Sequence, residues 1–214
     1  MKIKTAITVY AACGVVFAFC LVPALTDRFQ AAELAVFRAL CPAGGSFYEA
    51  LLKAITLLGN WKSAVLIAAL LLAVPRRGFR LKIALPAAAA ALFSVALNEG
   101  IKALVARARP AVALFSERGF SFPSGHAMNN GALYFTLFLL AHRYLKKGAL
   151  KTAVLCLLGI LPVFIAFSRV ALGVHYLSDV LAGLAVGFAL ATAAFQITVK
   201  NEGALQAAAQ KSVK

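Results

Sequence analysis

The sequence is poor in charged residues, and acidic residues are the scarcest among them. Only 14% of its 214 residues are charged, and Asp and Glu together number seven. A soluble domain has about 25% charged and about 45–50% apolar residues, whereas 63% of this chain is hydrophobic. A soluble protein of this length could not bury so much apolar side chain, because its surface is large for its volume. The composition therefore excludes an ordinary soluble domain and indicates a membrane protein of about one domain.

Nor do the cysteines suggest a metal centre, because no pair of the four has metal-ligand spacing. Basic residues, in contrast, are abundant: 22 Lys and Arg give a formal net charge of +15. No nucleic-acid motif or aromatic and basic surface accompanies this charge, so we expect no nucleic-acid partner. Most bases fall in short loops between apolar runs, which is typical of cytoplasmic loops and leaves some charge for anionic lipid or substrate.

Six apolar segments are long enough to cross a membrane, since a spanning helix needs about 20 residues. They are residues 5–25, 60–75, 82–104, 127–145, 149–168 and 176–198, of which the second is the shortest. The sequence therefore predicts an all-α fold, a bundle of six transmembrane helices. We expect residues 1–200 to form this single membrane domain and residues 201–214 to be a frayed or disordered cytoplasmic tail.

The stretch between the first two spans, residues 26–60, mixes charged with apolar residues. Apolar side chains recur there at three- and four-residue spacing, as at Leu51, Leu52 and Ile55, which is typical of an amphipathic helix. The pattern is broken at residues 42–45. We therefore predict two short helices that lie in the membrane interface.

The loop charges predict the orientation of the chain in the membrane. With six spans, the basic loops and both termini fall on one side, which is then cytoplasmic. The bases concerned are Lys2, Lys4, Arg76, Arg77, Arg80, Lys82, Arg143, Lys146, Lys147, Lys151, Lys200, Lys211 and Lys214. The first apolar run can also be read as a cleaved signal sequence ending near Val22-Pro23-Ala24, although its length favours an anchor.

The opposite membrane face collects residues that are costly in lipid. A charged residue inside a spanning helix costs about 2.5–3.5 kcal/mol, so such residues usually mark a functional site. Three bases, two of the chain's three histidines and one acid meet there. With the neighbouring Ser and Gly they are Lys102, Arg109, Ser124, Gly125, His126, Arg169, His175 and Asp179.

The basic residues of this set suit a phosphoryl group. Lys102, Arg109 and Arg169 can surround it, and the arginines offer planar forks of N–H donors. Ser124 stands where it can cap the fourth span. Gly125 then allows backbone N–H groups to approach an anion at the positive end of the helix dipole.

The histidines suit the chemical steps. His175 and Asp179 are four residues apart, so a helix places them on one face. The carboxylate can accept the ring N–H and leave the other ring nitrogen free to attack phosphorus. His126, with a reference pKa of about 6.5, suits proton transfer to the leaving oxygen. Arg107 has no part in this scheme and can be read as an interfacial anchor.

The set resembles the three-part signature of the type 2 phosphatidic acid phosphatase (PAP2) superfamily, the lipid phosphate phosphatases. That signature is Lys, six residues, Arg-Pro; then Pro-Ser-Gly-His; then Ser-Arg, five residues, His, three residues, Asp. This chain reads Lys102…Arg109-Pro110, Pro123-Ser124-Gly125-His126 and Ser168-Arg169…His175…Asp179. All eleven specified residues match in order and spacing.

The resemblance implies a metal-independent, cofactor-free hydrolase. By it, His175 takes the phosphoryl group as a covalent intermediate, Asp179 orients it, and His126 protonates the leaving group. It also implies a phosphate site made by Lys102, Arg109, Ser124, Gly125, His126 and Arg169.

The substrate implied by the resemblance is a lipid phosphate or diphosphate at the periplasmic or extracellular face of the inner (plasma) membrane. Candidates are undecaprenyl diphosphate, phosphatidylglycerophosphate, phosphatidic acid and lipid A phosphates. One alternative is a lipid-phosphate binder or transporter without hydrolysis, but binding alone needs no His175–Asp179 pair. Another is a vanadate-dependent haloperoxidase, which shares the oxyanion site but is soluble. The oligomeric state stays open.

The predicted topology is testable by labelling. A single cysteine at Ala113, in a cysteine-free background, should react with an impermeant thiol reagent from outside the cell, because residue 113 is predicted to lie on the face opposite the basic loops. Labelling that occurs only after the cytoplasmic side is opened would refute this orientation.

Overall fold

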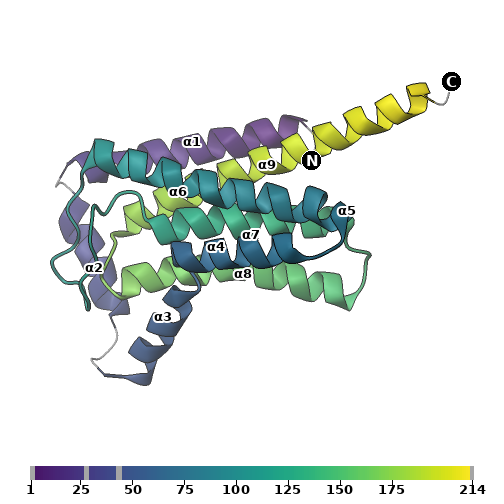
Figure 1. Cartoon of the computed structure of the whole chain (residues 1–214). Helices are drawn as coiled ribbons and strands as arrows, with labels where there is room; N and C mark the ends of the chain where they lie inside the picture. Colours follow the sequence, from purple (N-terminus) through teal and green to yellow (C-terminus); the bar gives the residue numbers. More distant parts are fainter. Residues whose placement is uncertain (1–2, 27–28, 42–44, 213–214) are drawn as a thin grey trace.

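The computed structural model describes residues 3–26, 29–41 and 45–212, and helices joined by loops make up these ranges (Figure 1). The all-α prediction is confirmed, since no strand occurs within these ranges. The helices are α1 (Ile3–Leu25), α2 (Gln30–Leu40), α3 (Phe47–Leu57), α4 (Trp61–Ala73), α5 (Arg77–Phe79), the π-helical turn η2 (Arg80–Ala84), α6 (Leu85–Val105), α7 (Gly125–Tyr144), α8 (Ala149–Ala171) and α9 (Leu177–Ser212).

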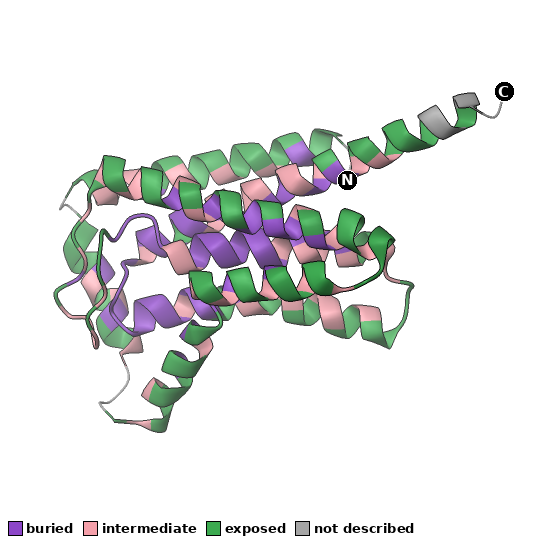
Figure 2. Ribbon diagram, viewed as in Figure 1, coloured by how far each residue is buried: buried purple, intermediate pink, exposed green. Residues whose placement is uncertain are grey.

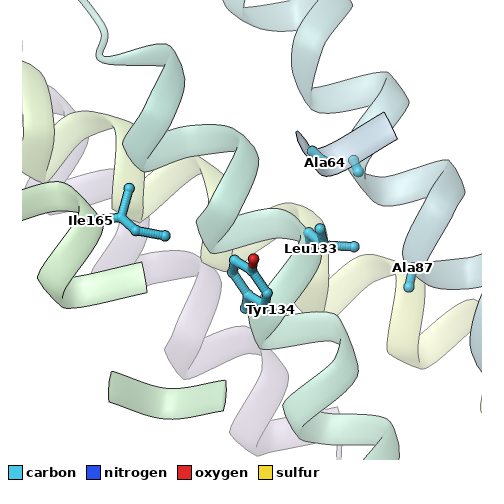
Figure 3. Close-up of a cluster of buried hydrophobic side chains, with 6 residues drawn as sticks. Ala64, Ala87, Leu133, Tyr134 and Ile165 are labelled. Carbon is cyan, nitrogen blue, oxygen red and sulfur yellow. The ribbon is translucent and has the colours of Figure 1, made fainter. Parts of the chain in front are cut away.

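Helix α7 is the centre of the bundle and packs against α6, α8 and α9, while α1 packs on α9. Figure 2 shows the buried residues concentrated along α7 and at the end of the bundle that bears α2. A cluster of buried side chains joins α4, α6 and α8 to α7 (Figure 3). In it, Ala64 and Ala87 leave room for Leu133, Tyr134 and Ile165, so that the helices approach closely.

The outer surface of the bundle is apolar, as a membrane protein requires. Large side chains such as Phe19, Leu70 and Leu150 are exposed on α1, α4 and α8. Four helices are long and apolar enough to cross a membrane, namely α1, residues 77–105, α8 and residues 177–207. A fifth span results if α3 and α4, which meet at a bend of 50°, are counted as one.

The count of six spans is therefore not confirmed, and α7 is the helix that does not qualify on hydropathy. Its first half carries His126, Asn129 and Asn130, which lower its apolar character. These amides are paired inside the protein: Asn129 accepts a bond from Ser94 (2.5 Å), and Asn130 donates to the Gly59 carbonyl (2.8 Å). Helix α7 is thus surrounded by other helices, which replace lipid as its environment.

The two short helices expected between the first two spans are present as α2 and α3. The predicted break at residues 42–45 falls largely outside the described residues. Helix α2 buries Glu33 and Phe37, and α3 buries Leu52 and Thr56. Their location in a membrane interface stays a prediction.

The expectation of a frayed tail is wrong for residues 201–212, because α9 continues through them. The segment is rich in Ala, the strongest helix former. Glu202 also pairs with Lys82 (3.0 Å) and Arg143 (3.1 Å), so this end of α9 is bound to η2 and α7.

The close approach of α7 and α9 depends on glycines. A Cβ on Gly183 would lie 2.6 Å from the Ser124 carbonyl oxygen, and one on Gly187 would lie 2.5 Å from that of Met128. Both distances are too short for carbon and oxygen. This is the arrangement of small residues four apart that allows membrane helices to pack backbone against backbone.

We therefore expect Gly187→Ala to lower the melting temperature of the protein in detergent, although Ala is the better helix former by about 1 kcal/mol. Gly14→Ala is the matched control, since a Cβ there meets nothing within 4 Å, and it should leave the melting temperature equal or higher. Equal melting temperatures for the two variants would contradict the packing argument.

Candidate active site

The residues singled out in the sequence meet at one end of the bundle. The C-terminal ends of α6 and α8 and the N-terminal ends of α7 and α9 lie together there, beside α2 (Figure 1). A cavity of about 450 Å³ at this end is lined by Lys102, Arg109, Gly125, His126 and His175. Arg169, Ser124 and Asp179 are buried, with at most 1% exposure.

The loop between α6 and α7, residues 106–124, carries two arginines into the site in different directions. Helix α6 ends at Ala106, whose backbone is left-handed (φ 49°) and whose N–H bonds the Lys102 carbonyl (2.8 Å). The chain is then non-helical, so Arg107 and Arg109 reach different partners. Arg107 bonds Asp179 (2.6 Å), whereas Arg109 Nη1 lies 3.2 Å from His175 Nε2.

His175 lies between α8 and α9, with Asp179 behind its ring. Its Nδ1 is 3.5 Å from Asp179 Oδ2. The same carboxylate oxygen accepts the Ser121 hydroxyl (2.5 Å) and the Tyr176 N–H (2.9 Å). The ring's Nε2 is on the side of Arg109 and Glu117, where a reacting group can approach it.

The pKa of His175 is lowered to about 4, chiefly because burial disfavours the charged ring, although the neighbouring Asp179 favours it. Arg169 and Arg109 lower the pKa further. The imidazole is therefore neutral at pH 7 and keeps one ring nitrogen with a free lone pair, as a nucleophile requires.

Glu117, in the α6–α7 loop, occupies the space between the two site arginines. Its Oε2 lies 2.8 Å from Arg109 Nη1 and 3.9 Å from His175 Nε2, and its Oε1 pairs with Arg169 Nη2. Burial raises the pKa of this carboxyl, but the attraction of Arg169 and Arg109 outweighs burial and holds the pKa below its usual value. A carboxylate thus bridges the two arginines, beside Nε2 of His175.

Hydrogen bonds hold both Arg109 and Arg169 in place, but one buried N–H of Arg169 has no partner. Arg109 donates to the carbonyls of Gly119, Arg118 and Val174 at 2.9–3.1 Å. Arg169 donates to Thr56 through Nη1 (2.7 Å), but its buried Nε has no partner. An unpaired buried donor is costly, so this N–H is suited to an additional anion.

Ser124 stands at the N-cap position of α7 but its side chain does not cap the helix, so that expectation is wrong. Its Oγ is buried and unpaired, while its backbone N–H bonds the Asp179 carbonyl (2.9 Å). The hydroxyl is therefore free for an anion. The next residue, Gly125, has no room for a side chain, because a Cβ there would lie 2.9 Å from Asn98 Oδ1.

His126 and Lys102 line the same cavity, beside Gly125. His126 is in the first turn of α7, on the same cavity as His175. Lys102 Nζ is 3.4 Å from Glu99 Oε1, at the end of α6. All eight predicted site residues thus belong to one end of the bundle, either on the cavity wall or directly behind it.

Sequence reasoning gave no role to four residues that contact this set directly or through one another. Glu117 and Ser121 lie in the loop; Glu33 and Arg107 form a buried pair at 2.6 Å. Arg107 is no interfacial anchor, since its side chain is 8% exposed. The one sequence signal was charge: Glu33 and Glu117 belong to a chain with only seven acids. Within the described ranges, no group of three or more His, Cys, Asp or Glu could hold a metal ion.

Comparison with known proteins gives matches in sequence and in structure. The family described as the PAP2 superfamily matches residues 83–202. Phosphatidylglycerophosphatase B of Bacillus subtilis is 42% identical over 98 residues, which are 44% of this chain and 47% of that protein. Lipid A 1-phosphatase of Rhizobium etli is 36% identical over 115 residues, 48% of this chain and 45% of that protein. The chain thus spans about half the length of these curated relatives.

Two solved structures have the same fold. A transmembrane PAP2-type phosphatidylglycerolphosphate phosphatase from Bacillus subtilis superposes with a TM-score of 0.74 and 26% identity, covering 91% of this chain and 96% of the other. LpxE from Aquifex aeolicus gives a TM-score of 0.60 at 22% identity, covering 76% and 94%. The second similarity concerns the fold alone.

The position of Glu117 leads to a binding prediction. An anion that binds both arginines must displace this carboxylate, so its apparent affinity is reduced by the fraction of molecules in which Glu117 is bound. Glu117→Gln should therefore bind inorganic vanadate or phosphate about tenfold more tightly than wild type, as measured by calorimetry on the protein in detergent. Glu49→Gln removes an acid that pairs with Lys53 on α3 and does not line the cavity, and is the control. Unchanged or weaker binding by Glu117→Gln would contradict the prediction.

Proposed function

Because the chain belongs to the PAP2 superfamily, we propose that it is an integral-membrane phosphatase that hydrolyses a lipid phosphate or lipid diphosphate through a phosphohistidine intermediate. The observation that carries the proposal is the arrangement around Nε2 of His175. This nitrogen belongs to a neutral imidazole whose other nitrogen, Nδ1, lies beside Asp179. It faces Arg109 and Arg169, which are bridged by the Glu117 carboxylate. A phosphoryl group in place of that carboxylate would lie against the nucleophile.

In the first step, Nε2 of His175 attacks phosphorus and the bond from phosphorus to the leaving oxygen breaks. Arg109 and Arg169 stabilise the charge on the phosphoryl oxygens, together with Lys102 and the free hydroxyl of Ser124. His126 gives a proton to the leaving oxygen. The ring of His175 becomes positively charged when it is phosphorylated, and the carboxylate of Asp179 stabilises that charge.

In the second step, water attacks the phosphohistidine and the bond from Nε2 to phosphorus breaks. His126, which lost its proton in the first step, can accept one from the water. Inorganic phosphate leaves and His175 returns to its neutral form. Each residue is thereby restored for the next turnover, and no step requires a cofactor.

A lipid substrate is supported by the surroundings of the site. The cavity wall includes Trp61 and Val95 beside its charged residues, so it offers apolar surface next to the phosphate site. The named relatives are a phosphatidylglycerophosphatase and lipid A 1-phosphatases. The loop charges favour a catalytic face outside the cytoplasm, in the inner (plasma) membrane, with both termini inside.

Phosphate release by the purified protein tests the proposal directly. We expect release from at least one of phosphatidylglycerophosphate, phosphatidic acid, undecaprenyl diphosphate and lipid A in detergent. Release should persist in excess chelator and be blocked by vanadate, which can adopt the five-coordinate geometry of phosphoryl transfer. Loss of turnover in chelator that magnesium restores would refute the mechanism, and no release from any of these lipids would refute the function.

The two histidines should respond differently to substitution. His175→Ala should abolish turnover of every substrate, since no phosphoenzyme can form. His126→Ala should impair hydrolysis of a monoester severely, because a lipid alkoxide is a poor leaving group without a proton. A diphosphate releases a lipid monophosphate, a far better leaving group, and should retain relatively more activity.

The measurement is the ratio of kcat/KM for monoester and diphosphate in wild type and in His126→Ala. His142→Ala is the control, because His142 is in the last turn of α7, at the other end of the helix. An unchanged ratio would remove the leaving-group role of His126, and an active His175→Ala would end the scheme.

A further inference from the structure

A buried chain of charges lies behind the nucleophile, on the side away from the cavity. One arm of Arg107, Nη1, contacts Asp179 Oδ1 at 2.6 Å, and the other arm, Nη2, contacts Glu33 Oε2 at 2.6 Å. The side chains of Glu33 and Arg107 are 9% and 8% exposed, and that of Asp179 is 0% exposed. Little solvent therefore screens these charges, and their interactions are stronger than those of a surface pair.

The second oxygen of Glu33 fixes helix α2 to the start of α9. Oε1 accepts the backbone N–H of Ser178 (2.9 Å) and the Ser178 hydroxyl (2.5 Å). An acid is favourable at a helix N-terminus because it meets unpaired N–H groups and the positive end of the dipole. The guanidinium of Arg107 also lies 3.9 Å above the Tyr176 ring. Glu33 is thus held by Ser178 and Arg107 by Tyr176, two residues that precede Asp179 in the chain.

We propose that Glu33 and Arg107 are positioning residues that hold the Asp179 carboxylate behind His175 and that their opposite charges balance one another there. The role rests on the function proposed above. Two carboxylates share one guanidinium, so Asp179 keeps its negative charge for the imidazole. Without Glu33, Arg107 would be neutralised by Asp179 alone and would draw that carboxylate away from His175. Without Arg107, two carboxylates would face each other in a buried site.

His175 also meets other charges, which the substitutions below leave in place. The ionisable groups around it, drawn from α2, the α6–α7 loop and α6 to α9, are Glu33, Glu99, Lys102, Arg107, Arg109, Glu117, Arg118, His126, Arg169 and Asp179. Changing Glu33 or Arg107 alters the charge behind the ring without removing a group that faces the cavity. The effect on His175 therefore isolates the chain of charges.

The proposal predicts opposite changes for the two residues. Glu33→Gln removes a negative charge, so the pKa of His175 should fall, and Arg107→Gln removes a positive charge, so it should rise. The double variant restores the balance and should return the pKa toward that of wild type. For Glu33→Gln, kcat should fall by about 10- to 100-fold with little change in KM, the loss seen when outer partners of a metal-bound histidine are disturbed.

The titration can be measured on the full chain in detergent. The sequence has three histidines, so ring carbon-13 NMR gives three signals, which His126→Gln and His142→Gln assign. Glu49→Gln is the control, because it breaks an acid–lysine pair on α3 (Glu49 to Lys53, 2.5 Å) that does not touch the site. It should leave the His175 titration unchanged.

Opposite shifts that cancel in the double variant would support the charge balance. Shifts in the same direction, or a double variant that moves further than either single one, would overturn it, since a general loosening of the site exposes His175 in every variant. If Arg107→Gln fails to fold, Arg107→Lys keeps the charge and loses the two-armed contact. It should keep the His175 titration and lower kcat; unchanged kcat would overturn the positioning role. The titration needs no substrate, so a protein that titrates as expected but hydrolyses no lipid phosphate would refute only the proposed function.

Discussion

The burial of Asp179 is the constraint around which the end of the bundle is built. A carboxylate removed from water is tolerated only when it is paired and hydrogen-bonded. Asp179 obtains its partners from the loop, through Ser121 and Arg107, and from the start of its own helix, through the Tyr176 N–H. Each partner in turn restricts the chain that supplies it. The loop therefore follows a path that also brings Arg109 to His175.

The second constraint is that α7 must pass through the protein and not beside lipid. Its polar first half would be costly in a membrane, but Ser94 bonds the Asn129 oxygen and the Gly59 carbonyl bonds the Asn130 amide nitrogen. The glycines of α9 allow the two helices to approach closely enough that the Ser124 N–H reaches the Asp179 carbonyl. Helix packing and site geometry are therefore one arrangement: the turn at Ser124 and the carboxylate-bearing residue Asp179 behind His175 are joined by a backbone hydrogen bond.

Much of the fold and of the site could be predicted from the sequence because the apolar runs and the site residues form short, recognisable sequence patterns. His175 and Asp179 are four residues apart, and Arg109, Ser124 and Arg169 belong to short motifs beside apolar runs. His175 nevertheless precedes α9, so the prediction that one helix face carries both His175 and Asp179 is wrong, although the two side chains do meet. The remaining features depend on contacts between distant parts of the chain. Glu33 and Ser178 are 145 residues apart, and no spacing rule connects them. The left-handed residue Ala106 decides which arginine faces which acid, and Ala is an unusual residue for that conformation. The same limit explains the errors over the Ser124 cap and the tail after residue 200, where tertiary partners decide.

The carboxylate of Glu117 means that the protein carries its own counter-ion. Glu117 offsets part of the positive charge of Arg109 and Arg169 within the chain, so these arginines depend less on a chloride or a lipid head group from their surroundings. By the function proposed above, a phosphoryl group would bind by ion exchange, because the Glu117 carboxylate would leave the arginines as the phosphoryl oxygens take its place. The net charge of the pocket changes only by the difference between the two anions. Binding that proceeds in this way releases few ions to solution, and its strength depends less on salt than the number of arginines would suggest.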